Sequence, residues 1–587
     1  MNSQTKTCQN CHLEFTIEPE DFAFYKKIDV PPPTFCPQCR MQRRFGFRNL
    51  LNLYKRTCSL CGESIVSMYD AEAPFPVYCP PCWWGDGWDA MQYGTDYDFS
   101  KPFFRQFREL LEEVPRVALI NENSARSDYC NHAISCNNCY MCFSIGDSVD
   151  SFYSSPQIVN IRNCTSCSMV RDDELCAEIV NCDKSYALRY SRNSIGCMNS
   201  WFLLNCRNCR DCVGCVNLRN KQYHIFNIPY TKAGYENKLK ELDLGGYAKL
   251  CEFGEKFRAF LLRNIHRWAI SENSVNVTGD NIIESKNCKE VFVAFHAEHC
   301  AYSFVLTNGK DSYDTNHMYP NGELCYETIS AIESTAAVGC SMLRTGCSRI
   351  WYSDGCVGCA DSFGCVSVKK RSYCVLNKQY TKDEYEKLTE KIRAHMAEMP
   401  YRDAKGRTYG FGEFFPVETS PFAYNQSVAM EYFPLSQEKA VVEGYGWNIP
   451  KERNYTVTLK AEELPDHVNE AGDSIVSETI GCSHGQKCLH NCTTAFRILP
   501  EELALYRRIS IPLPRTCPNC RYAERMAQRN PPKLWHRKCA CDYNVYANTV
   551  KHSHHPEGKC PNEFETSYAP DRPEIVYCES CYNSEVA

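Results

Sequence analysis

The stretch GCMNSWFLLNCRNCRDCVGC at 196–215 recurs 150 residues later as GCSRIWYSDGCVGCADSFGC at 346–365. Matches at this offset run from ENS at 122–124, repeated at 272–274, to YE at 235–236, repeated at 385–386. With a slip of one residue, ELC-x-E at 174–178 also matches 323–327. So many identities at nearly one offset indicate an internal duplication, with one half at 121–230 and the other at 271–380.

Short apolar runs, broken by Asn, Gly, Ser and Asp, fill each half. Asn160, Asn181, Asn205 and Asn227 end such runs at spacings of 21, 24 and 22 residues. Regularly spaced β-rich runs are typical of solenoid coils, and the small cysteine thiol suits a narrow interior. We therefore predict a mainly β fold, a duplicated right-handed parallel β-helix (solenoid) with coils of about 20 residues.

Helices are expected beside these halves. Residues 91–120 predict a linking helix, 231–270 a helical insertion, and 381–398 a helix that begins with a capping box of Thr381 and Glu384. Such helices would cover open sheet edges. Residues 399–480 contain too many aromatic residues for a free linker, so we predict a connector that packs over the solenoid.

The two ends of the chain share one cysteine framework. EDFAFYKKIDVPPPTFCPQCR at 20–40 aligns without a gap with EELALYRRISIPLPRTCPNCR at 501–521. We predict a double zinc ribbon at 1–90 and another at 481–587, because closely spaced cysteine pairs supply thiolates for tetrahedral zinc. The candidate ligands are Cys8, Cys11, Cys36, Cys39, Cys58, Cys61, Cys79, Cys82, Cys488, Cys492, Cys517, Cys520, Cys539, Cys541, Cys578 and Cys581.

Two cysteine pairs complete one zinc shell, so about four zinc ions are expected. The N-terminal sets are expected to be 8, 11, 36, 39 and 58, 61, 79, 82, with interleaved pairing as an alternative. The single residue within Cys539-x-Cys541 makes that pair awkward. Candidates to replace one member are Cys560, His552, His554 and His555.

Residues 6–44 and 486–525 resemble the family of probable zinc-ribbon domains. The shared pattern is a cysteine knuckle, a Phe, a helix with an acidic-x-x-Phe-Tyr motif, a Pro and C-x2-C-R-x-x-R. The second copy departs from it at its C-x3-C pair and at Glu524. The whole chain is similar to long uncharacterised zinc-ribbon and β-helix proteins of candidate-phyla bacteria. The resemblance implies zinc binding and implies no reaction.

Composition points to a reducing compartment. The chain of 587 residues contains 41 cysteines. Its first residues lack the basic and apolar regions of a signal peptide, and no apolar run approaches the ~18–20 residues of a membrane helix. We expect a cytoplasmic protein with no membrane partner and with thiols free or on metal.

Charge is unevenly placed along a chain of net charge −6. Residues 30–62 contain six cations and no acid, and residues 507–538 contain nine cations against Glu524 alone. Such stretches, with aromatic neighbours, predict contact with nucleic acid. Equally, these arginines could pack against the acidic middle of the same chain. The candidate nucleic-acid ligands are Arg40, Arg43, Arg44, Arg48, Lys55, Arg56, Arg521, Arg525, Arg529, Lys533, Arg537 and Lys538.

Cys206, Cys209, Cys212 and Cys215 have a spacing that resembles iron–sulfur ferredoxins. The alternative is a set of core thiols in stacked turns, which we favour because Ser362 takes the place of Cys212 in the second copy. Acids and histidines at 296–317 could serve polysaccharide cleavage, but no spacing fixes a site there. A solvated strand is the simpler interpretation.

These observations favour a non-enzymatic, zinc-stabilised cytoplasmic binding scaffold that contacts nucleic acid or a nucleoprotein through its basic ribbons. One alternative is a protein-interaction or assembly module that uses the solenoid face. The other is a carbohydrate-active or iron–sulfur redox enzyme built on a β-helix. The sequence predicts no catalytic residues and no oligomeric state.

Overall fold

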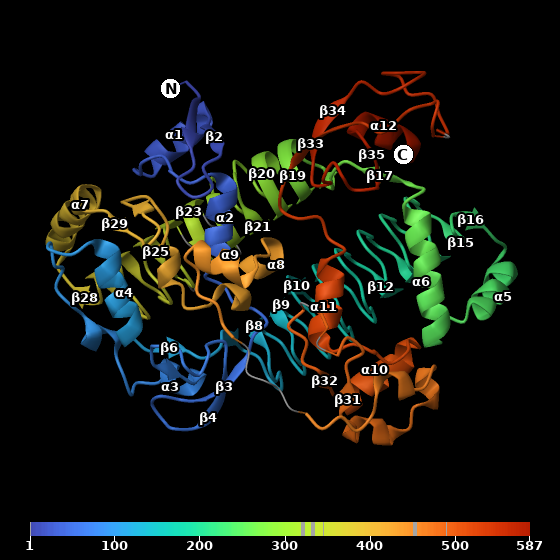
Figure 1. Ribbon diagram of the computed structural model, residues 1–587, viewed down its shortest axis with the longest axis horizontal. Coiled ribbons are helices and arrows are strands. Elements are labelled where there is room, and N and C mark those ends of the chain that lie inside the picture. The colour runs from blue at the N-terminus through green and yellow to red at the C-terminus, as the bar shows by residue number, and fades with distance from the viewer. Residues whose placement is uncertain are drawn as a thin grey trace.

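The computed structural model describes residues 2–318, 323–329, 335–343, 346–449, 455–485, 487–488, 490–546 and 548–586. Within these ranges most long-range strand pairs are parallel, and they follow the duplication (Figure 1). The first half contributes two five-stranded sheets. Their strands are β7 (Asn121–Glu122), β8 (Asn131–Ile134), β9 (Phe143–Gly146), β10 (Ile158–Val159), β11 (Val170–Arg171), β12 (Tyr186–Arg189), β13 (Met198–Trp201), β14 (Arg210–Val213), β15 (Gln222–Ile225) and β16 (Ile228–Pro229).

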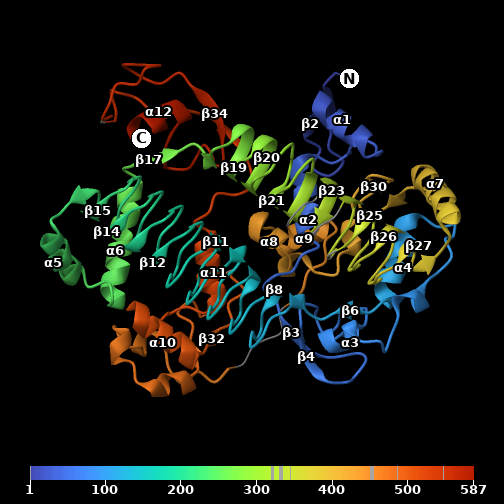
Figure 2. The ribbon, with the colours of Figure 1, turned by 180° about the vertical axis from the view of Figure 1, so that it is seen from behind.

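The second half forms one sheet that is eleven strands wide within the described ranges, ordered from β18 to β28. Figure 2 shows its strands beside those of the first half. They are β18 (Ser271–Glu272), β19 (Val275–Ile283), β20 (Lys286–Phe295), β21 (Phe304–Thr307), β22 (Tyr313–Met318), β23 (Glu323–Ile329), β24 (Thr335–Val338), β25 (Ser348–Trp351), β26 (Ala360–Phe363), β27 (Ser372–Val375) and β28 (Lys378–Gln379).

Successive parallel strands are offset by 11 to 13 residues, so the predicted repeat of about 20 is wrong. Leu188 pairs with Ser200, and Trp201 pairs with Val213. The asparagines used to count the repeat belong to different ladders. Asn181 donates to Asn193 Oδ1 at 2.9 Å one strand later, so the 24 residues from Asn181 to Asn205 span two strands. Asn160 instead donates to Asp172 Oδ1 at 2.6 Å.

A left-handed backbone residue at nearly every third position explains this short repeat. In the first half, φ is +51° at Asn205, +50° at Asn208 and +49° at Asp211. Asn and Asp tolerate this conformation better than most residues, which accounts for their frequency here. The residue after each of these three is a buried cysteine. The C-x2-C-x2-C spacing is therefore the backbone period itself.

Hairpins and helices close the last strand of each half. β15 turns back into the antiparallel β16, and β27 turns back into β28. Asn227 Nδ2 donates to Val216 O at 2.9 Å, and its repeat partner Asn377 makes the same bond to Val366 O at 2.9 Å. The flanking elements are α4 (Phe103–Glu113), β6 (Arg116–Val117), α5 (Lys232–Leu242), α6 (Tyr247–Leu261), β17 (Ile265–Arg267) and α7 (Lys382–Glu398).

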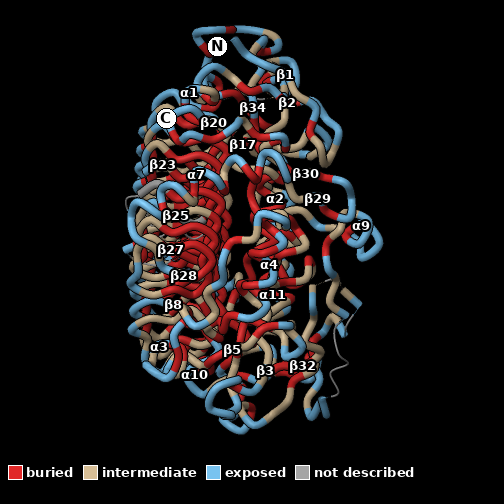
Figure 3. Tube along the Cα trace, turned by 90° about the vertical axis from the view of Figure 1, so that its left-hand side faces the viewer, coloured by how far each residue is buried: buried red, intermediate tan, exposed pale blue. Residues whose placement is uncertain are grey.

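These helices cover the sheets with aromatic contacts. Phe253 of α6 lies 5.1 Å from Phe202 between ring centroids, and Phe103 of α4 lies 5.2 Å from Phe363. The predicted capping box forms at the start of α7, where Thr381 and Glu384 bond each other's backbone N–H. Figure 3 shows that the buried residues form a continuous column along the stacked strands.

The two ends form related modules. The N-terminal module contains β1 (Gln4–Thr7), β2 (Glu14–Ile17), α1 (Pro19–Lys27), α2 (Pro37–Phe45), β3 (Tyr54–Thr57), β4 (Ser64–Ser67), β5 (Val77–Tyr78) and α3 (Pro80–Trp84). The C-terminal module contains β31 (Ile480–Gly481), β32 (Ala495–Phe496), α10 (Pro500–Ile509), α11 (Pro518–Met526), β33 (Trp535–Lys538), β34 (Glu563–Thr566), β35 (Ile575–Tyr577) and α12 (Glu579–Val586).

The first helix-bearing part of each module contacts the half that is farther from it in the sequence. α2 of the N-terminal module contacts β22 and β23 of the second half, whereas α11 lies over the strands of the first half (Figure 1). The second part of each module, β3 to α3 and β33 to α12, has the opposite placement. β5 pairs with β6, which leads into the first half, and β35 pairs with β17, which leads into the second. Each module therefore contacts both halves.

The connector between α7 and the C-terminal module packs on the rest of the chain. It contains β29 (Tyr401–Arg402), β30 (Thr408–Tyr409), α8 (Ala429–Tyr432) and α9 (Gln437–Val442) among short turns. Phe415 stacks on Phe107 of α4, with 5.1 Å between ring centroids. Across the described residues, we find no helix with the length and apolar character needed to cross a membrane.

Candidate metal centres and buried arginines

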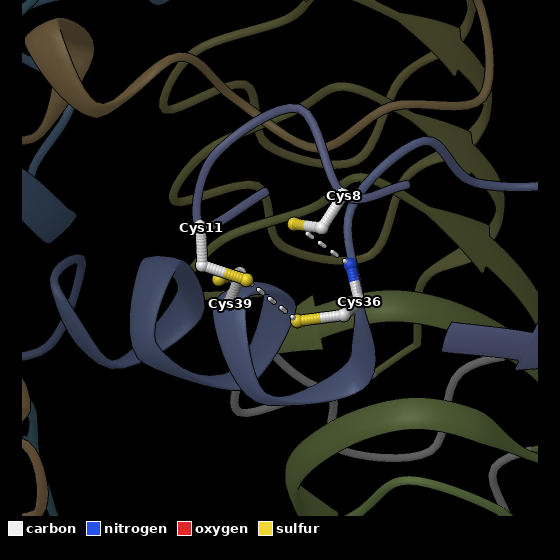
Figure 4. Close-up of side chains that lie close together, drawn as sticks. All are labelled: Cys8, Cys11, Cys36 and Cys39. Atoms are coloured by element: carbon white, nitrogen blue, oxygen red, sulfur yellow. Dashed lines mark hydrogen bonds between the residues drawn. The ribbon is translucent and has the colours of Figure 1, made fainter. Parts of the chain in front are cut away.

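Cys8, Cys11, Cys36 and Cys39 lie together at the start of α2, with their sulfur atoms turned toward one another (Figure 4). All four sulfurs lie within 4.8 Å of each other, and Cys11 Sγ is 3.7 Å from Cys36 Sγ. Cys36 N donates to Cys8 Sγ at 3.3 Å. Four convergent sulfurs can hold a metal ion. These are the four cysteines that the sequence grouped as one set.

Cys58, Cys61, Cys79 and Cys82 form a second group in the same module. Cys61 Sγ lies 3.9 Å from Cys79 Sγ, and Cys79 N donates to Cys58 Sγ at 3.3 Å. Although burial opposes it, the N–H groups of Cys61 and Cys79 lower the pKa of Cys58 to about 6. This favours the thiolate, which is the form that binds metal.

The first C-terminal group differs at one position from the predicted set. It consists of Cys482, Cys492, Cys517 and Cys520, so Cys482 takes the place expected for Cys488. The reason is structural: Cys482 follows β31 as Cys8 follows β1, and it accepts the N–H of Cys517 at 3.2 Å. Its position directly after a β-prone run was the sequence signal for this role.

The second C-terminal group consists of Cys539, Cys560, Cys578 and Cys581. Cys560, named from the sequence as an alternative ligand, replaces Cys541 in it. Cys578 N donates to Cys539 Sγ at 3.1 Å, and Cys560 Sγ lies 3.9 Å from Cys578 Sγ. The first sulfur of every group thus accepts the same kind of backbone N–H.

The displaced cysteines lie beside these groups. Cys488 Sγ is 3.6 Å from Cys520 Sγ, and Cys541 Sγ is 3.6 Å from His552 Nδ1. His555 Nε2 lies 3.1 Å from Cys581 Sγ, and His554 Nε2 lies 3.3 Å from the same sulfur. The histidines named from the sequence therefore surround the second C-terminal group.

The run from Cys206 to Cys215 lies in the core of the first half, where all four cysteines are buried. Cys206 Sγ donates to Leu204 O at 3.6 Å and Cys215 O at 3.5 Å, and the other three thiols each donate to two carbonyls in the same way. Burial raises the pKa of Cys206 well above its usual value. Donation to carbonyls requires protonated sulfur, whereas an iron–sulfur cluster requires thiolates.

The arginines of α2 are buried against the acids of the second half. Arg40 Nε donates to Asp314 Oδ1 at 3.0 Å, and Arg44 Nη1 donates to the same oxygen at 2.9 Å. Arg43 Nη2 donates to Glu327 Oε1 at 2.7 Å. The three arginine side chains are at most 2% exposed. Burial raises the pKa of Glu327 and Arg43 opposes that rise, as in a desolvated ion pair.

The arginines of α11 contact the first half, and Arg521 also contacts α10 of its own module. Arg525 Nη1 donates to Glu178 Oε2 at 3.2 Å, and Arg525 Nη2 donates to Tyr153 O at 3.2 Å. Arg521 Nη1 donates to Tyr506 Oη at 2.9 Å and lies 3.9 Å from Glu502 Oε1. Both arginines are buried.

The two docking sites share some contacts and differ in others, because Glu524 takes the place of Arg43 in α11 and Arg525 contacts Glu178 instead. Glu178 and Glu327 occupy the same place in the repeated ELC-x-E motif. Tyr302 O accepts from Arg44 at 3.2 Å, as Tyr153 O accepts from Arg525. The phenol of Tyr302 donates to Asp21 of α1 at 2.9 Å. The duplicated modules and halves therefore share the tyrosine contacts, whereas the repeated glutamates are bound by arginines at different positions of α2 and α11.

This burial changes the meaning of the basic stretches. Arg40, Arg43, Arg44, Arg48, Arg521 and Arg525 are buried, so these predicted nucleic-acid ligands do not lie on the surface of this structure. Arg40, Arg43, Arg44 and Arg525 instead contact carboxylates of the chain's own middle, as in the alternative to nucleic-acid binding. Of the other predicted cations, Lys55, Lys533 and Lys538 are exposed, and Arg56, Arg529 and Arg537 are half-buried.

The acids and histidines of residues 296–316 do not converge as a paired carboxylate site among the described side chains, and the side chain of His317 lies outside them. Asp314 is held by Arg40 and Arg44 and is fully buried. His299 Nδ1 lies 3.4 Å from Asp311 Oδ1, and both side chains are partly exposed. This arrangement matches a structural role for Asp314.

No family model, no curated protein and no solved structure matched the chain in our comparisons. The resemblance of both ends to zinc-ribbon domains therefore depends on the cysteine spacing and on the four convergent cysteine groups.

Proposed function

We propose that this protein is a non-enzymatic, zinc-stabilised binding scaffold, in which two ribbon modules clamp a duplicated β-solenoid that binds a protein partner on its outer surface. The observation that carries the proposal is the burial of the ribbon arginines against Asp314, Glu327 and Glu178. A cation buried against the chain's own carboxylate offers no charge to an external phosphate.

Zinc is the metal that best suits the four cysteine groups. Zinc in structural sites takes four thiolates in a tetrahedron and needs no open position. Every cysteine lies in the described ranges and all are free of disulfides. This supports a reducing compartment such as the cytoplasm. A filled shell leaves no position for a substrate, which supports a structural role.

The proposed β-solenoid extends the observed parallel sheets to closed coils. Two observations support it: the offset of 11 to 13 residues between strands, and the left-handed residue at nearly every third position. Together they suggest a coil of four short sides. Right-handed coiling is expected, because nearly all parallel crossovers have that hand.

Affinity purification of the tagged chain from its native cells tests the scaffold function. One sample is left untreated, one is treated with nuclease and one with a zinc chelator. We expect the same protein partner with and without nuclease, and its loss after chelation, because the modules depend on metal. Recovery that requires intact nucleic acid would contradict this proposal.

Nucleic-acid binding is the second candidate, and the two second ribbons favour it. β3 carries the exposed Lys55, and β33 carries Trp535 and the exposed Lys538. Lys533 Nζ lies 5.1 Å from the Trp535 ring centroid. Aromatic side chains beside cations suit single-stranded nucleic acid.

Fluorescence anisotropy with labelled RNA and DNA at low and moderate salt tests the second candidate. Salt-sensitive binding that is weakened in the triple variant K55A/K533A/K538A would establish it. The matched control is K238A, which removes an exposed lysine from α5. Absence of binding at low salt would eliminate this candidate.

A further inference from the structure

Each cysteine group of the C-terminal module contains, between its first and second cysteines, a long loop that the N-terminal module lacks. Two residues separate Cys8 from Cys11, whereas nine separate Cys482 from Cys492. Two residues separate Cys58 from Cys61, whereas twenty separate Cys539 from Cys560. Both longer loops contain further cysteine and histidine residues: His484, Cys488 and His490 in the first, and Cys541, His552, His554 and His555 in the second.

In the first loop, these residues converge on a sulfur that already belongs to a cysteine group. His484, Cys488, His490 and Cys520 each place a ligand atom within 4.8 Å of the others. Cys488 Sγ lies 3.6 Å from Cys520 Sγ. Cys520 is therefore common to two sets of four ligand atoms.

The histidines of the first loop are positioned as metal ligands. Nδ1 of His484 and Nδ1 of His490 are both buried and have no hydrogen-bond partner among the described residues. The other nitrogen of His484, Nε2, lies 3.4 Å from Glu524 Oε1. A carboxylate on the far nitrogen is the usual way in which a protein orients a metal-binding imidazole.

In the second loop, the same pattern forms around Cys581. Cys541 Sγ lies 3.6 Å from His552 Nδ1, which lies 3.2 Å from His555 Nε2. His555 Nε2 in turn lies 3.1 Å from Cys581 Sγ. In a zinc tetrahedron with the usual Zn–S and Zn–N lengths, neighbouring ligand atoms are about 3.3–3.8 Å apart. The observed separations are close to these edges.

A carboxylate again supports the central histidine. His552 Nε2 lies 2.9 Å from Glu585 Oε1, with the histidine side chain fully buried and the glutamate 6% exposed. Nδ1 of His555 is buried without a partner among the described residues. His554 is exposed and lies near Cys560 and Cys581, whose group already has four sulfurs.

We propose that each cysteine group of the C-terminal module is half of a binuclear zinc centre, in which Cys520 and Cys581 are thiolates shared by two ions. The second ions would be held by His484, Cys488 and His490 with Cys520, and by Cys541, His552 and His555 with Cys581. Two cysteines and two imidazoles make a complete zinc shell. This inference builds on the zinc assigned above to the four-cysteine groups.

The binuclear centres give a function to features that the four-cysteine groups do not use. They give a ligand role to Cys488 and Cys541, which are not members of the four-cysteine groups, and to the buried histidines beside them. They also close both long loops onto the module, where a shared thiolate couples each loop to the cysteine group. The N-terminal module, with its two-residue knuckles, has no room for such ligands.

Zinc content per chain, measured by elemental analysis on the purified full-length protein, tests the proposal. We expect six ions, against four if the cysteine groups alone bind zinc. The variants H484A/H490A and H552A/H555A should each retain five. The control H536A, which removes a 60%-exposed histidine from β33, should retain six.

The outcomes separate this inference from the proposed function. Four ions in the unmodified chain would overturn the binuclear centres and leave the scaffold intact, while zero ions would overturn both. Five ions in the unmodified chain would mean that only one loop binds a second ion. That loop is the one whose variant contains four ions, and the centre proposed at the other loop would be overturned. Circular dichroism of each variant confirms that the module remains folded.

Cadmium-113 NMR of the fully exchanged protein tests the shared thiolates directly. We expect two pairs of resonances, each pair coupled through one sulfur, and two uncoupled resonances from the N-terminal module. Six uncoupled resonances would overturn the sharing of Cys520 and Cys581.

Discussion

The N-terminal and C-terminal modules share part of their docking contacts and differ in the loops between the first two cysteines of each cysteine group. Both insert two arginines of one helix, Arg40 and Arg44 or Arg521 and Arg525, into the duplicated halves. Yet the longer loops of the C-terminal module contain further cysteine and histidine residues. Docking depends on fixed contacts in a packed interface, whereas a knuckle at the surface can lengthen without disturbing the interface. The docking contacts therefore hold each module on the duplicated halves, whereas the loops can differ between the two modules.

A single connector helix meets both modules, by different means. On the N-terminal side, Tyr432 of α8 packs against Phe45 of α2, with 5.0 Å between ring centroids. On the C-terminal side, Tyr522 Oη of α11 donates to Glu431 Oε2 at 2.6 Å, and Arg529 lies 5.2 Å from the Tyr432 ring centroid. The N-terminal contact is apolar and the C-terminal contact is polar, so the two respond differently to pH.

Removal of metal should have the largest effect, and it should affect both modules. Structural zinc in small domains contributes about 10–16 kcal/mol to folding. After treatment with a strong chelator, limited proteolysis followed by mass spectrometry should show new cleavage within 1–90 and 481–587. A module that stays resistant to protease without metal would show that its cysteines are not metal ligands.

Loss of the docking glutamates should affect the two modules unequally. Glu327 is fully buried and Glu178 is 21% exposed in its side chain. Breaking a fully buried pair costs about 3–5 kcal/mol, whereas a partly exposed pair is worth about 1 kcal/mol. Thermal unfolding should therefore show a larger decrease in midpoint for E327A than for E178A.

The control for this pair is E109A, because Glu109 lies on the surface of α4. It should leave the unfolding midpoint unchanged. Equal decreases for E327A and E178A would show that the two docking sites do not differ in solvation.

The polar contact of α8 should make stability depend on pH. Burial raises the pKa of Glu431 to about 7, above its ordinary value of 4.5. The folded protein then holds a proton that the unfolded chain releases, so stability decreases as pH rises from about 4.5 to 7 and is constant above that. The variant E431Q should remove this dependence and gain up to about 3 kcal/mol above pH 7. Thermal unfolding at pH 5.5 and pH 8 measures it.

The matched control is E438A, since Glu438 lies exposed on α9. A pH dependence that persists in E431Q would mean that another group controls stability in this range.

Replacing Cys212 of the first half with the serine found at the equivalent position of the second half should have the smallest effect on stability. Ser362 takes the place of Cys212 in the repeat, and Ser362 Oγ donates to Ala360 O at 3.2 Å as Cys212 Sγ donates to Arg210 O at 3.3 Å. Because the hydroxyl makes the same bond, C212S should cost about 1 kcal/mol or less. Metal content and the visible spectrum should not change. Loss of iron or of a visible band in C212S would instead establish a cluster at this run.

The features found from the sequence are those encoded by local spacing. The duplication, the four-cysteine sets of the N-terminal module and the capping box of α7 each depend on residues that are close in the chain or repeated at a fixed offset. The strand repeat of 12 residues was missed because Asn160 and Asn181 belong to different ladders. Counting every third residue, rather than every asparagine, would have revealed it.

The features missed depend on contacts between distant segments. Nothing in the local sequence of α2 states that Arg43 meets Glu327 or that α11 meets the other half. The role of Cys482 required an alignment of strand ends rather than of cysteine pairs. The ligand atoms of the long loops converge only when the chain has folded, because His555 and Cys581 are 26 positions apart in the sequence.

Chemical labelling of arginine in the native protein tests the central claim most directly. A guanidinium-specific reagent, followed by peptide mass spectrometry, reports which arginines are accessible. The account predicts that Arg40, Arg43, Arg44 and Arg525 stay unmodified in the native protein and react after denaturation, while the exposed Arg105 and Arg258 react in both states. Rapid native labelling of the four buried arginines would contradict the account, because those side chains would then face solvent rather than the two halves.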